Sequence, residues 1–222
     1  MINKNTSNKK LVKNKVNELN KKIILTGPPG GGKGILSGIL KDEFNLPHIA
    51  MGDILRNQVE KKTKLGKQIE KAMNSGDLIS DDVVNNLVEK RLVKKDVKKR
   101  FVLDGYPRHL EQAKFLLSKT KIDEIIVIKL SDKKIIERLK GRLVCPKCGT
   151  PYHLKNIPPK VKGICDKCGT KLIKRNDEDK IIHRLKLYHK ETEPILKFYK
   201  KMNIKIKIIP GDFDVKTEKI KL

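Results

Sequence analysis

The stretch that decides the fold is Gly27-Pro28-Pro29-Gly30-Gly31-Gly32-Lys33. It fits the pattern G-x-x-x-x-G-K, and it lies between the apolar run Ile23-Ile24-Leu25 and a helical pattern over residues 33–43. Glycines let successive backbone N–H groups converge on phosphate oxygens, and the N-terminus of the following helix adds its dipole. Strand, loop and helix occur in the order that this motif requires. The stretch therefore predicts a phosphate-binding loop whose Lys33 reaches the β- and γ-phosphates of a nucleotide.

Outward from this loop, short apolar strands alternate with helical patterns. Strands are predicted at 23–26, 47–50, 101–103, 124–130 and 204–209, and helices at 33–43, 53–60, 65–75, 80–92, 110–117, 132–140 and 179–199. Such alternation is typical of a parallel sheet covered by helices on both faces. We therefore predict an α/β fold, with a doubly wound parallel sheet like that of P-loop NTPases.

Length and composition favour one folded domain with insertions. The chain has 222 residues, a formal net charge of +26, 37% hydrophobic residues and 4% aromatic residues. No apolar run approaches the roughly 18 residues of a transmembrane helix, and the N-terminus lacks the apolar segment of a secretion signal. We therefore predict no membrane partner. Residues 1–22 are interpreted as a basic N-terminal tail, either solvated without a role or a targeting segment.

The positive charge is mostly lysine, with 44 Lys and only 8 Arg. A nucleic-acid-binding protein is expected to use Arg for bidentate and stacking contacts, and to place aromatic residues among its basic ones. This chain has few aromatics and spreads its lysines evenly, so a nucleic-acid-binding zinc ribbon is a minor alternative. Six of the 8 Arg residues lie in or beside the motifs below. That clustering indicates sites that need a planar guanidinium.

Four cysteines form two knuckles in a segment, 143–175, that interrupts the strand–helix alternation. Their spacing is C-x2-C-x16-C-x2-C, with a glycine after each pair, and the sulfur donors are Cys145, Cys148, Cys165 and Cys168. Paired knuckles of this kind bind tetrahedral Zn²⁺. Four thiolates leave no open coordination position, so we predict a structural zinc and not a catalytic one. Disulfides and an iron–sulfur cluster are weaker alternatives.

Several motifs follow one another along the chain from Lys22 to the C-terminus. They are G-P-P-G-G-G-K-G at 27–34, H-I-A-M-G-D-I-L-R at 48–56, S-G-D-L-I at 75–79, D-G-Y-P-R at 104–108 with Gln112 after it, and Arg138-x-x-x-Arg142. In order and spacing, this succession resembles the adenylate kinase family, in its long form with a metal-binding lid.

The resemblance implies a P-loop kinase core over residues 23–142 and 176–222. It places inserted helices that bind a nucleoside monophosphate at 50–80, and a small zinc-bound lid at 143–175. The catalytic residues that it implies are Lys33, Arg108, Arg138, Arg142, Arg175 and Arg184. The nucleotide-binding residues that it implies are Gly27, Gly30, Gly31, Gly32, Lys33, Gly34, Ile35, Met51, Asp53, Arg56, Gly76, Asp77, Leu78, Ile79, Asp104, Gly105, Arg108, Gln112 and Tyr152.

The activity that the resemblance implies is reversible phosphoryl transfer from ATP to AMP with Mg²⁺, by a monomer in the cytoplasm or, if the tail is a targeting segment, in a mitochondrion or plastid. Elementary chemistry explains the residue types. Two anionic nucleotides must be held with their phosphates in line, so several cations must converge. A closing lid excludes water, which would otherwise hydrolyse the γ-phosphate. Asp104 ends an apolar strand, where a carboxylate can hold Mg²⁺ through water.

Three positions depart from the family pattern. Ile35 has no hydroxyl where such loops usually offer one, and Ala50-Met51 stand where the family usually has a hydroxyl pair. Arg175 and Arg184 are closer together than the family pattern places them. Because of these departures, a second interpretation is that the chain is a weakly active or non-catalytic nucleotide-binding relative of the family. Because the sequence alone does not identify the base of the donor nucleotide, a GTP-dependent AMP kinase is a further alternative.

Overall fold

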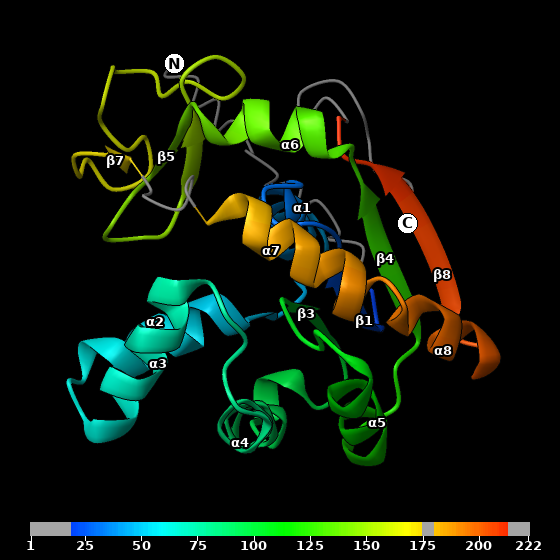
Figure 1. Cartoon of the computed structure of the whole chain (residues 1–222). Coiled ribbons are helices and arrows are strands. Elements are labelled where there is room, and N and C mark those ends of the chain that lie inside the picture. The colour runs from blue at the N-terminus through cyan, green and yellow to red at the C-terminus, as the bar shows by residue number, and fades with distance from the viewer. Residues whose placement is uncertain (1–18, 175–179, 213–222) are drawn as a thin grey trace, which may run out of the picture.

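The computed structural model describes residues 19–174 and 180–212, which form an α/β fold around a five-stranded sheet (Figure 1). The strand order is β2-β3-β1-β4-β8, and every neighbouring pair is parallel. The strands are β1 (Lys22–Thr26), β2 (His48–Ala50), β3 (Phe101–Asp104), β4 (Glu124–Lys129) and β8 (Lys205–Pro210). The predicted parallel sheet is therefore confirmed, with strands close to their predicted ranges.

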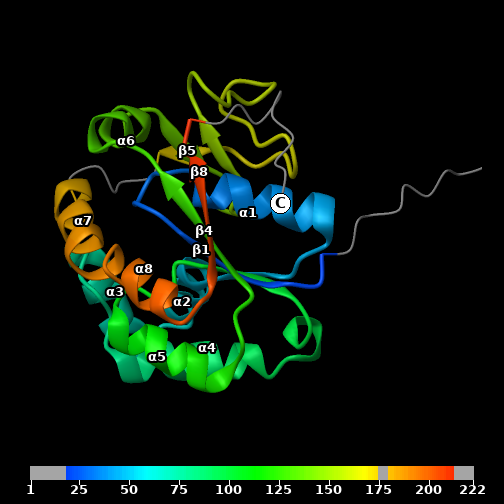
Figure 2. The same cartoon turned by 90° about the vertical axis from the view of Figure 1, so that its right-hand side faces the viewer.

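Helices cover both faces of the sheet, because successive residues of a strand point to opposite sides. Ile23 and Leu25 of β1 pack with Leu36 of α1 on one face. Ile24 lies on the other face, in a core shared with α4, α5 and α8. These helices are α1 (Lys33–Phe44), α4 (Asp81–Leu92), α5 (Leu110–Lys119) and α8 (Ile195–Lys201). Figure 2 shows α1 on one side of the strands and α5 and α8 on the other.

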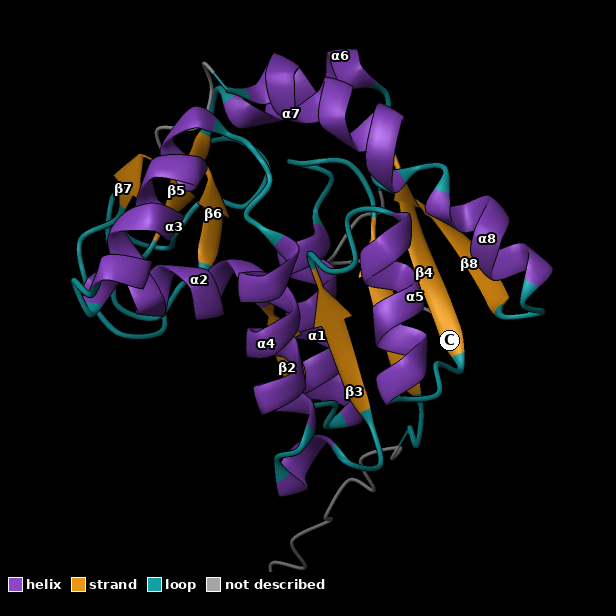
Figure 3. Ribbon diagram, turned by 60° about the horizontal axis from the view of Figure 1, so that its bottom comes forward, coloured by secondary structure: helices purple, strands orange, loops and turns teal. Residues whose placement is uncertain are grey.

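Two helices follow β2 directly, in the range where the sequence predicts an insertion. They are α2 (Met51–Glu60) and α3 (Lys64–Ser75). The Thr63 hydroxyl caps α3 by accepting a hydrogen bond from the Gly66 backbone N–H at 3.0 Å. A Cβ at Gly66 would stand 2.4 Å from the Gln58 carbonyl oxygen, so this glycine permits the close packing of the two helices. Figure 3 shows both helices set to one side of the sheet, the same side as the lid strands.

Helix α6 (Asp132–Leu139) leads from β4 into a second, smaller sheet. Its three antiparallel strands have the order β6-β5-β7 and comprise β5 (Arg142–Val144), β6 (Pro151–His153) and β7 (Ile173–Lys174). Its buried residues are Cys145, Tyr152, Cys165 and Leu172. This sheet spans most of the segment predicted as a lid, and its buried cluster is separate from those of the parallel sheet.

The region predicted as one helix over 179–199 is divided. It comprises α7 (Ile181–Leu187), a π-helical turn η2 (Tyr188–Thr192), and α8 after Pro194. Proline has no N–H and cannot continue an α-helical hydrogen-bond ladder. The Glu193 N–H instead donates to the Tyr188 carbonyl oxygen at 2.9 Å, five residues back. The expectation of one continuous helix was therefore wrong.

Residues 1–18 of the predicted tail lie outside the described residues, but the last residues of that range belong to the fold. Leu19 packs against the core, and Lys22 is the first residue of β1. Nζ of Lys21 lies 2.7 Å from Oε2 of the buried Glu124. Among the described residues, we find no helix that is both long enough and apolar enough to cross a membrane.

Candidate active site

The glycine loop that is predicted to bind phosphate joins β1 to α1. Gly27 has a φ of +143°, and a Cβ there would stand 2.7 Å from the Ile128 carbonyl oxygen, so only glycine fits. Lys33, the first residue of α1, donates from Nζ to the carbonyl oxygens of Gly27 at 2.7 Å and of Pro28 at 2.8 Å. These bonds hold the ammonium group beside the start of α1, where the helix dipole favours an anion.

Positive charge crowds around Lys33. Burial lowers the pKa of Lys33 to about 8, although the nearby carboxylate of Asp104 opposes this shift. Repulsion from Arg184, Arg108 and Arg142 lowers the pKa further. Like charges that destabilise one another in this way are stabilised when an anion lies between them. The cluster is therefore suited to hold phosphate groups.

Arg108 belongs to the loop between β3 and α5. Its Nε donates to the Gly105 carbonyl oxygen at 3.1 Å, and its backbone N–H donates to Oε1 of Gln112 at 2.8 Å. Burial, followed by repulsion from Arg184, lowers the pKa of Arg108 to about 10, while Asp104 opposes the shift. The guanidinium is thus held by its own loop beside the other cations.

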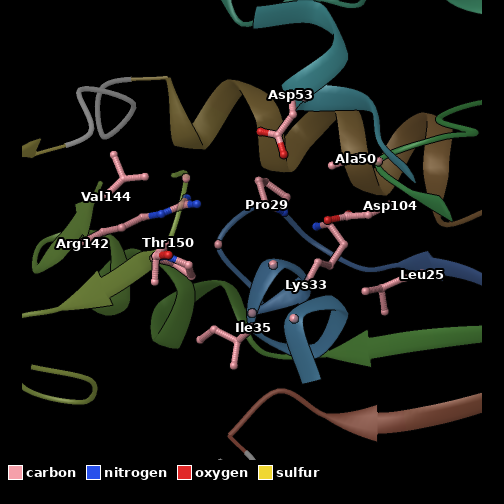
Figure 4. Close-up of a pocket in the computed structure, with 18 of the residues that line it drawn as sticks. Leu25, Pro29, Lys33, Ile35, Ala50, Asp53, Asp104, Arg142, Val144 and Thr150 are labelled. Carbon is pink, nitrogen blue, oxygen red and sulfur yellow. The ribbon is translucent and has the colours of Figure 1, made fainter. Parts of the chain in front are cut away.

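Asp104 is the last residue of β3, and the parallel register sets it beside Leu25 of β1 and Ala50 of β2. The carboxyl ends of parallel strands share one edge of the sheet, where ligands bind in open α/β folds. The side chains of Asp104 and Lys33 point toward one another (Figure 4). Oδ2 of Asp104 also lies 3.7 Å from Nε2 of His48. A carboxylate at this edge suits the cation that accompanies a nucleotide.

These side chains line one cavity of about 1470 Å³. Pockets for a single small ligand are commonly about 300–1,000 Å³, so this cavity has room for two nucleotides. The predicted catalytic and nucleotide-binding residues that line it are Gly27, Gly30, Gly32, Lys33, Gly34, Ile35, Asp53, Arg56, Gly76, Leu78, Asp104, Gly105, Arg108, Arg138, Arg142, Tyr152 and Arg184.

Of the predicted catalytic and nucleotide-binding residues that the structure describes, five do not line this cavity: Gly31, Met51, Asp77, Ile79 and Gln112. Met51 is 1% exposed and belongs to the core beside β1 and β3, and Ile79 packs against the same core. The carboxylate of Asp77 turns toward α7, where Oδ1 lies 2.8 Å from Nε2 of His183. Position in a motif therefore does not decide which side of a helix or turn faces the ligand.

Arginines reach the cavity from both of its rims. Arg138 of α6 and Arg142 of β5 lie on the lid side, and Nη1 of Arg138 donates to the Gly211 carbonyl oxygen just after β8. Arg56 lies on the side of the inserted helices, where it pairs with Asp53 one helical turn earlier. Cations that come from several elements can enclose two phosphate chains at once.

The four cysteines of the lid meet at one point. Their sulfur atoms all lie within 4.8 Å of one another, and this donor set fits a tetrahedral metal ion. Burial acts to raise the pKa of Cys165, but a hydrogen bond from the Tyr152 hydroxyl and the backbone N–H groups of Lys167 and Cys168 lower it to about 6. The hydroxyl group of Tyr152, a residue predicted to bind nucleotide, therefore donates a hydrogen bond to Sγ of Cys165.

Two contacts at the cavity could not be predicted from the motifs. The Thr192 hydroxyl donates to the Arg108 carbonyl oxygen at 2.7 Å. Nζ of Lys167 in the lid lies 3.8 Å from Oδ2 of Asp42 at the end of α1. Both contacts join segments far apart in the chain, and no local pattern marks them. Arg175, predicted as catalytic, lies outside the described residues.

The sequence was also compared with known proteins. The sequence profile of the family described as adenylate kinase matches residues 25–204. This chain belongs to the adenylate kinase family. An adenylate kinase of Acholeplasma laidlawii is 43% identical over 190 residues, which cover 82% of this chain and 88% of the relative. An adenylate kinase of Petrotoga mobilis is 45% identical over 197 residues, which cover 86% of this chain and 90% of the relative.

Membership of the adenylate kinase family makes the chain a phosphotransferase that acts on a nucleoside monophosphate. The family match begins in β1 and ends just before β8, so it contains the phosphate-binding loop, the inserted helices and the lid. The predicted kinase activity is therefore confirmed at this level.

Proposed function

We propose that this adenylate kinase homologue transfers the γ-phosphoryl group of ATP to AMP and forms two molecules of ADP, with Mg²⁺ bound to the donor nucleotide. One observation carries the proposal: Arg108, Arg142 and Arg184 repel the Lys33 ammonium group, Asp104 attracts it, and all five residues line a single large cavity. Phosphoryl transfer depends on positioning and charge stabilisation, and this site offers cations in place of a nucleophilic side chain.

In the proposed reaction, an oxygen of the AMP phosphate attacks the γ-phosphorus of ATP. The new P–O bond forms as the bond to the β,γ-bridging oxygen breaks, and the negative charge passes to the leaving ADP. Lys33 neutralises the charge on the β- and γ-phosphates of ATP. Arg108 binds the acceptor phosphate of AMP, and Arg184 neutralises the group in transfer. Asp104 would hold the Mg²⁺ ion, which would neutralise part of the phosphate charge of ATP.

The two sides of the cavity support the two nucleotides. We assign AMP to the side of the inserted helices at 50–80, where Arg56, Gly76 and Leu78 line the cavity. We assign ATP to the loop and to the lid at 143–175, where Arg138 and Arg142 lie. Movement of the lid over ATP would exclude water and so favour transfer over hydrolysis.

Within the proposal, Cys145, Cys148, Cys165 and Cys168 hold a structural zinc. Their compact arrangement supports this, and four sulfur ligands leave no position for a substrate. The metal would supply coordination bonds that fix the two knuckles, and with them the strands that carry Arg142.

Two observations bear on the alternatives that the sequence left open. Ile35 lines the cavity and also packs against the core beside α1, where it offers no hydroxyl. Met51 is buried in the core, so its thioether does not take the place of a hydroxyl facing the acceptor. Because neither residue offers a hydroxyl, a weakly active relative is one alternative against which the proposal is tested. A GTP-dependent AMP kinase is the other, because the sequence does not identify the base of the donor nucleotide.

The decisive experiment is a turnover panel with ATP or GTP as donor and AMP, GMP, CMP or UMP as acceptor. We expect ATP with AMP to give the highest kcat/KM, and ADP to be the product from both nucleotides. Preference for GTP would replace the donor in this proposal. Binding of both nucleotides without turnover would establish the non-catalytic alternative.

We propose a cytoplasmic monomer as the working form. The relatives described above come from bacteria, and they give no support to the organelle alternative. Size-exclusion chromatography with light scattering tests the oligomeric state.

A further inference from the structure

The π-helical turn η2 lies between α7 and α8 and contacts both α6 and the loop that carries Arg108. Its five residues, Tyr188–Thr192, end in the hydrogen bond from the Glu193 N–H to the Tyr188 carbonyl oxygen. Such turns add one residue to an α-helix and are frequent at functional sites. Because an α-helix advances by about 100° per residue, the extra residue rotates the side chains that follow it.

This rotation matters because α7 and α8 face different partners. Ile181 and Leu185 of α7 pack against α6, whereas Ile195 and Tyr199 of α8 pack into the core on the face of α4 and α5. Thr192 is the last residue of the turn, and its hydroxyl donates to the Arg108 carbonyl oxygen at 2.7 Å. The turn thus brings the Thr192 hydroxyl to the backbone of the loop between β3 and α5.

We propose that Thr192 is a positioning residue for the kinase reaction, which fixes the peptide of Arg108 and thereby aims the Arg108 guanidinium at the acceptor phosphate of AMP. This inference rests on the proposed function, because Arg108 acts on phosphate only there. Thr192 itself is not assigned any contact with a nucleotide.

Arg108 is held at both ends of its backbone unit. Its N–H donates to Oε1 of Gln112 at 2.8 Å, and its carbonyl oxygen accepts from Thr192. Gln112 is in turn held by its Nε2, which donates to Oδ1 of Asp81 at 2.8 Å. With both peptide groups fixed, the side chain leaves the loop in one direction, and its Nε is secured on Gly105.

Fixing the backbone matters more here than at an ordinary surface arginine. Burial lowers the pKa of the Arg108 guanidinium most, and repulsion from Arg184 lowers it further. A cation under repulsion moves away if its backbone permits. A displacement of about 1 Å at a reacting centre can cost up to 10²-fold in rate, so loss of one of the two backbone anchors is expected to reduce kcat measurably.

His189, a residue of the turn, connects it to neighbouring segments. Its Nδ1 lies 2.9 Å from Oε2 of Glu193, and its Nε2 lies 3.1 Å from Oδ1 of Asp132 at the start of α6. These exposed contacts tie the turn to α6, the helix that leads to Arg138 and the lid. They give the turn a fixed location from which Thr192 can act on Arg108.

The test compares Thr192→Val, which removes the hydroxyl at similar volume, with Thr192→Ser, which keeps it. We expect Thr192→Val to lower kcat by about tenfold, within the range of misplacement effects, and to weaken AMP binding measured by calorimetry. The KM for ATP should change less than twofold. Thr192→Ser should restore kcat to within twofold of the wild type.

Ser118→Ala is the matched control, because the Ser118 hydroxyl also donates to a carbonyl at 2.7 Å, on the exposed side of α5. It should leave kcat unchanged. In an Arg108→Lys background, Thr192→Val should have little further effect on kcat, since a positioning residue acts through its partner.

Unchanged kcat and AMP affinity in Thr192→Val, equal loss in Thr192→Ser, or full additivity with Arg108→Lys would each overturn the inference, whatever happens to the melting temperature. Failure of the proposed function has a different signature, since the wild-type chain itself would then transfer no phosphoryl group. AMP affinity of the wild type and of Thr192→Val still decides the inference in that case.

Discussion

The parallel-sheet core and the lid supply cations to the same cavity, but they are built on different physical principles. The core buries two apolar layers, one on each face of the sheet, and its strands consist largely of isoleucine, leucine and valine. The buried cluster of the lid has four members, and two of them are cysteines. A cluster this small offsets little of the entropy lost on ordering the chain.

The difference teaches how one site can be rigid on one side and adjustable on the other. The glycine loop, Lys33 and Arg108 lie in segments that directly follow the buried strands β1 and β3. Apolar burial of these strands therefore fixes their location without any ligand. The small buried cluster of the lid contains two of the four neighbouring cysteines, and the ion pair that joins the lid to α1, Lys167 with Asp42, is exposed. Internal rigidity with weak attachment is suited to a cover that opens and closes.

Metal removal should separate the two regions most strongly. Structural zinc contributes about 10 kcal/mol or more to the folding of small zinc domains. After chelation, backbone hydrogen exchange should become fast in residues 142–174, while the amides of β1 and β4 keep their protection. Mass spectrometry of exchanged peptides measures this, and re-addition of zinc is the control. Equal loss of protection in the core would show that the lid is not an independent unit.

Removal of a core cation should abolish chemistry without affecting the fold. Arg108→Ala is expected to lower kcat by about 10³-fold or more, as for arginines that stabilise phosphoryl transfer. Its unfolding midpoint in urea should stay the same or rise, because a repelled cation is lost. Arg91→Ala, which breaks a surface pair with Asp96, is the control and should keep full activity. A folded Arg108→Ala variant with wild-type kcat would contradict the assignment.

The pH dependence of stability should reveal the buried charge of the core. The pKa of Lys33 is lowered from 10.5 to about 8, so between these values the folded protein binds fewer protons than the unfolded chain. Its contribution to the free energy of unfolding therefore rises with pH across that window.

We expect Lys33→Met to remove a rise on the order of 2 kcal/mol, measured by urea unfolding between pH 7.5 and 10.5. Lys71→Met, a change of an exposed lysine on α3, is the control and should retain the wild-type slope. Identical slopes for Lys33→Met and the wild type would show that the Lys33 charge is not destabilised in the fold.

The smallest effect is expected where the two regions touch. Both partners of the Lys167–Asp42 pair are 63% exposed, and such pairs contribute about 0.5 kcal/mol or less. Asp42→Asn should raise the KM for the donor less than twofold at low salt and not at all at about 0.5 M salt, where exposed charges are screened. Glu111→Gln, which breaks an exposed pair on α5, should leave this KM unchanged. A larger effect of Asp42→Asn would mean that the pair does more than guide closure.

Much of the core could be predicted because its signals are local. Apolar strands such as Ile125-Ile126-Val127-Ile128, and a glycine loop ending in Lys33, each specify their own conformation over a few residues. The cysteine knuckles are likewise local. A structure was needed where a residue's role depends on which way it faces: Met51 and Ile79 stand in ligand-binding motifs but pack into the core.

By itself, the sequence determined the parallel α/β fold, the glycine loop between strand and helix, the two cysteine knuckles and the family, because each depends on residue type and short spacing. Only the tertiary structure decided how the site is assembled. It brought Asp104, Lys33 and Arg108 to one edge of the sheet, divided the helix after Leu187, and placed Thr192 on the Arg108 carbonyl. The physical reason is that these relations arise when distant segments pack together, and packing is governed by the whole core and not by any single motif.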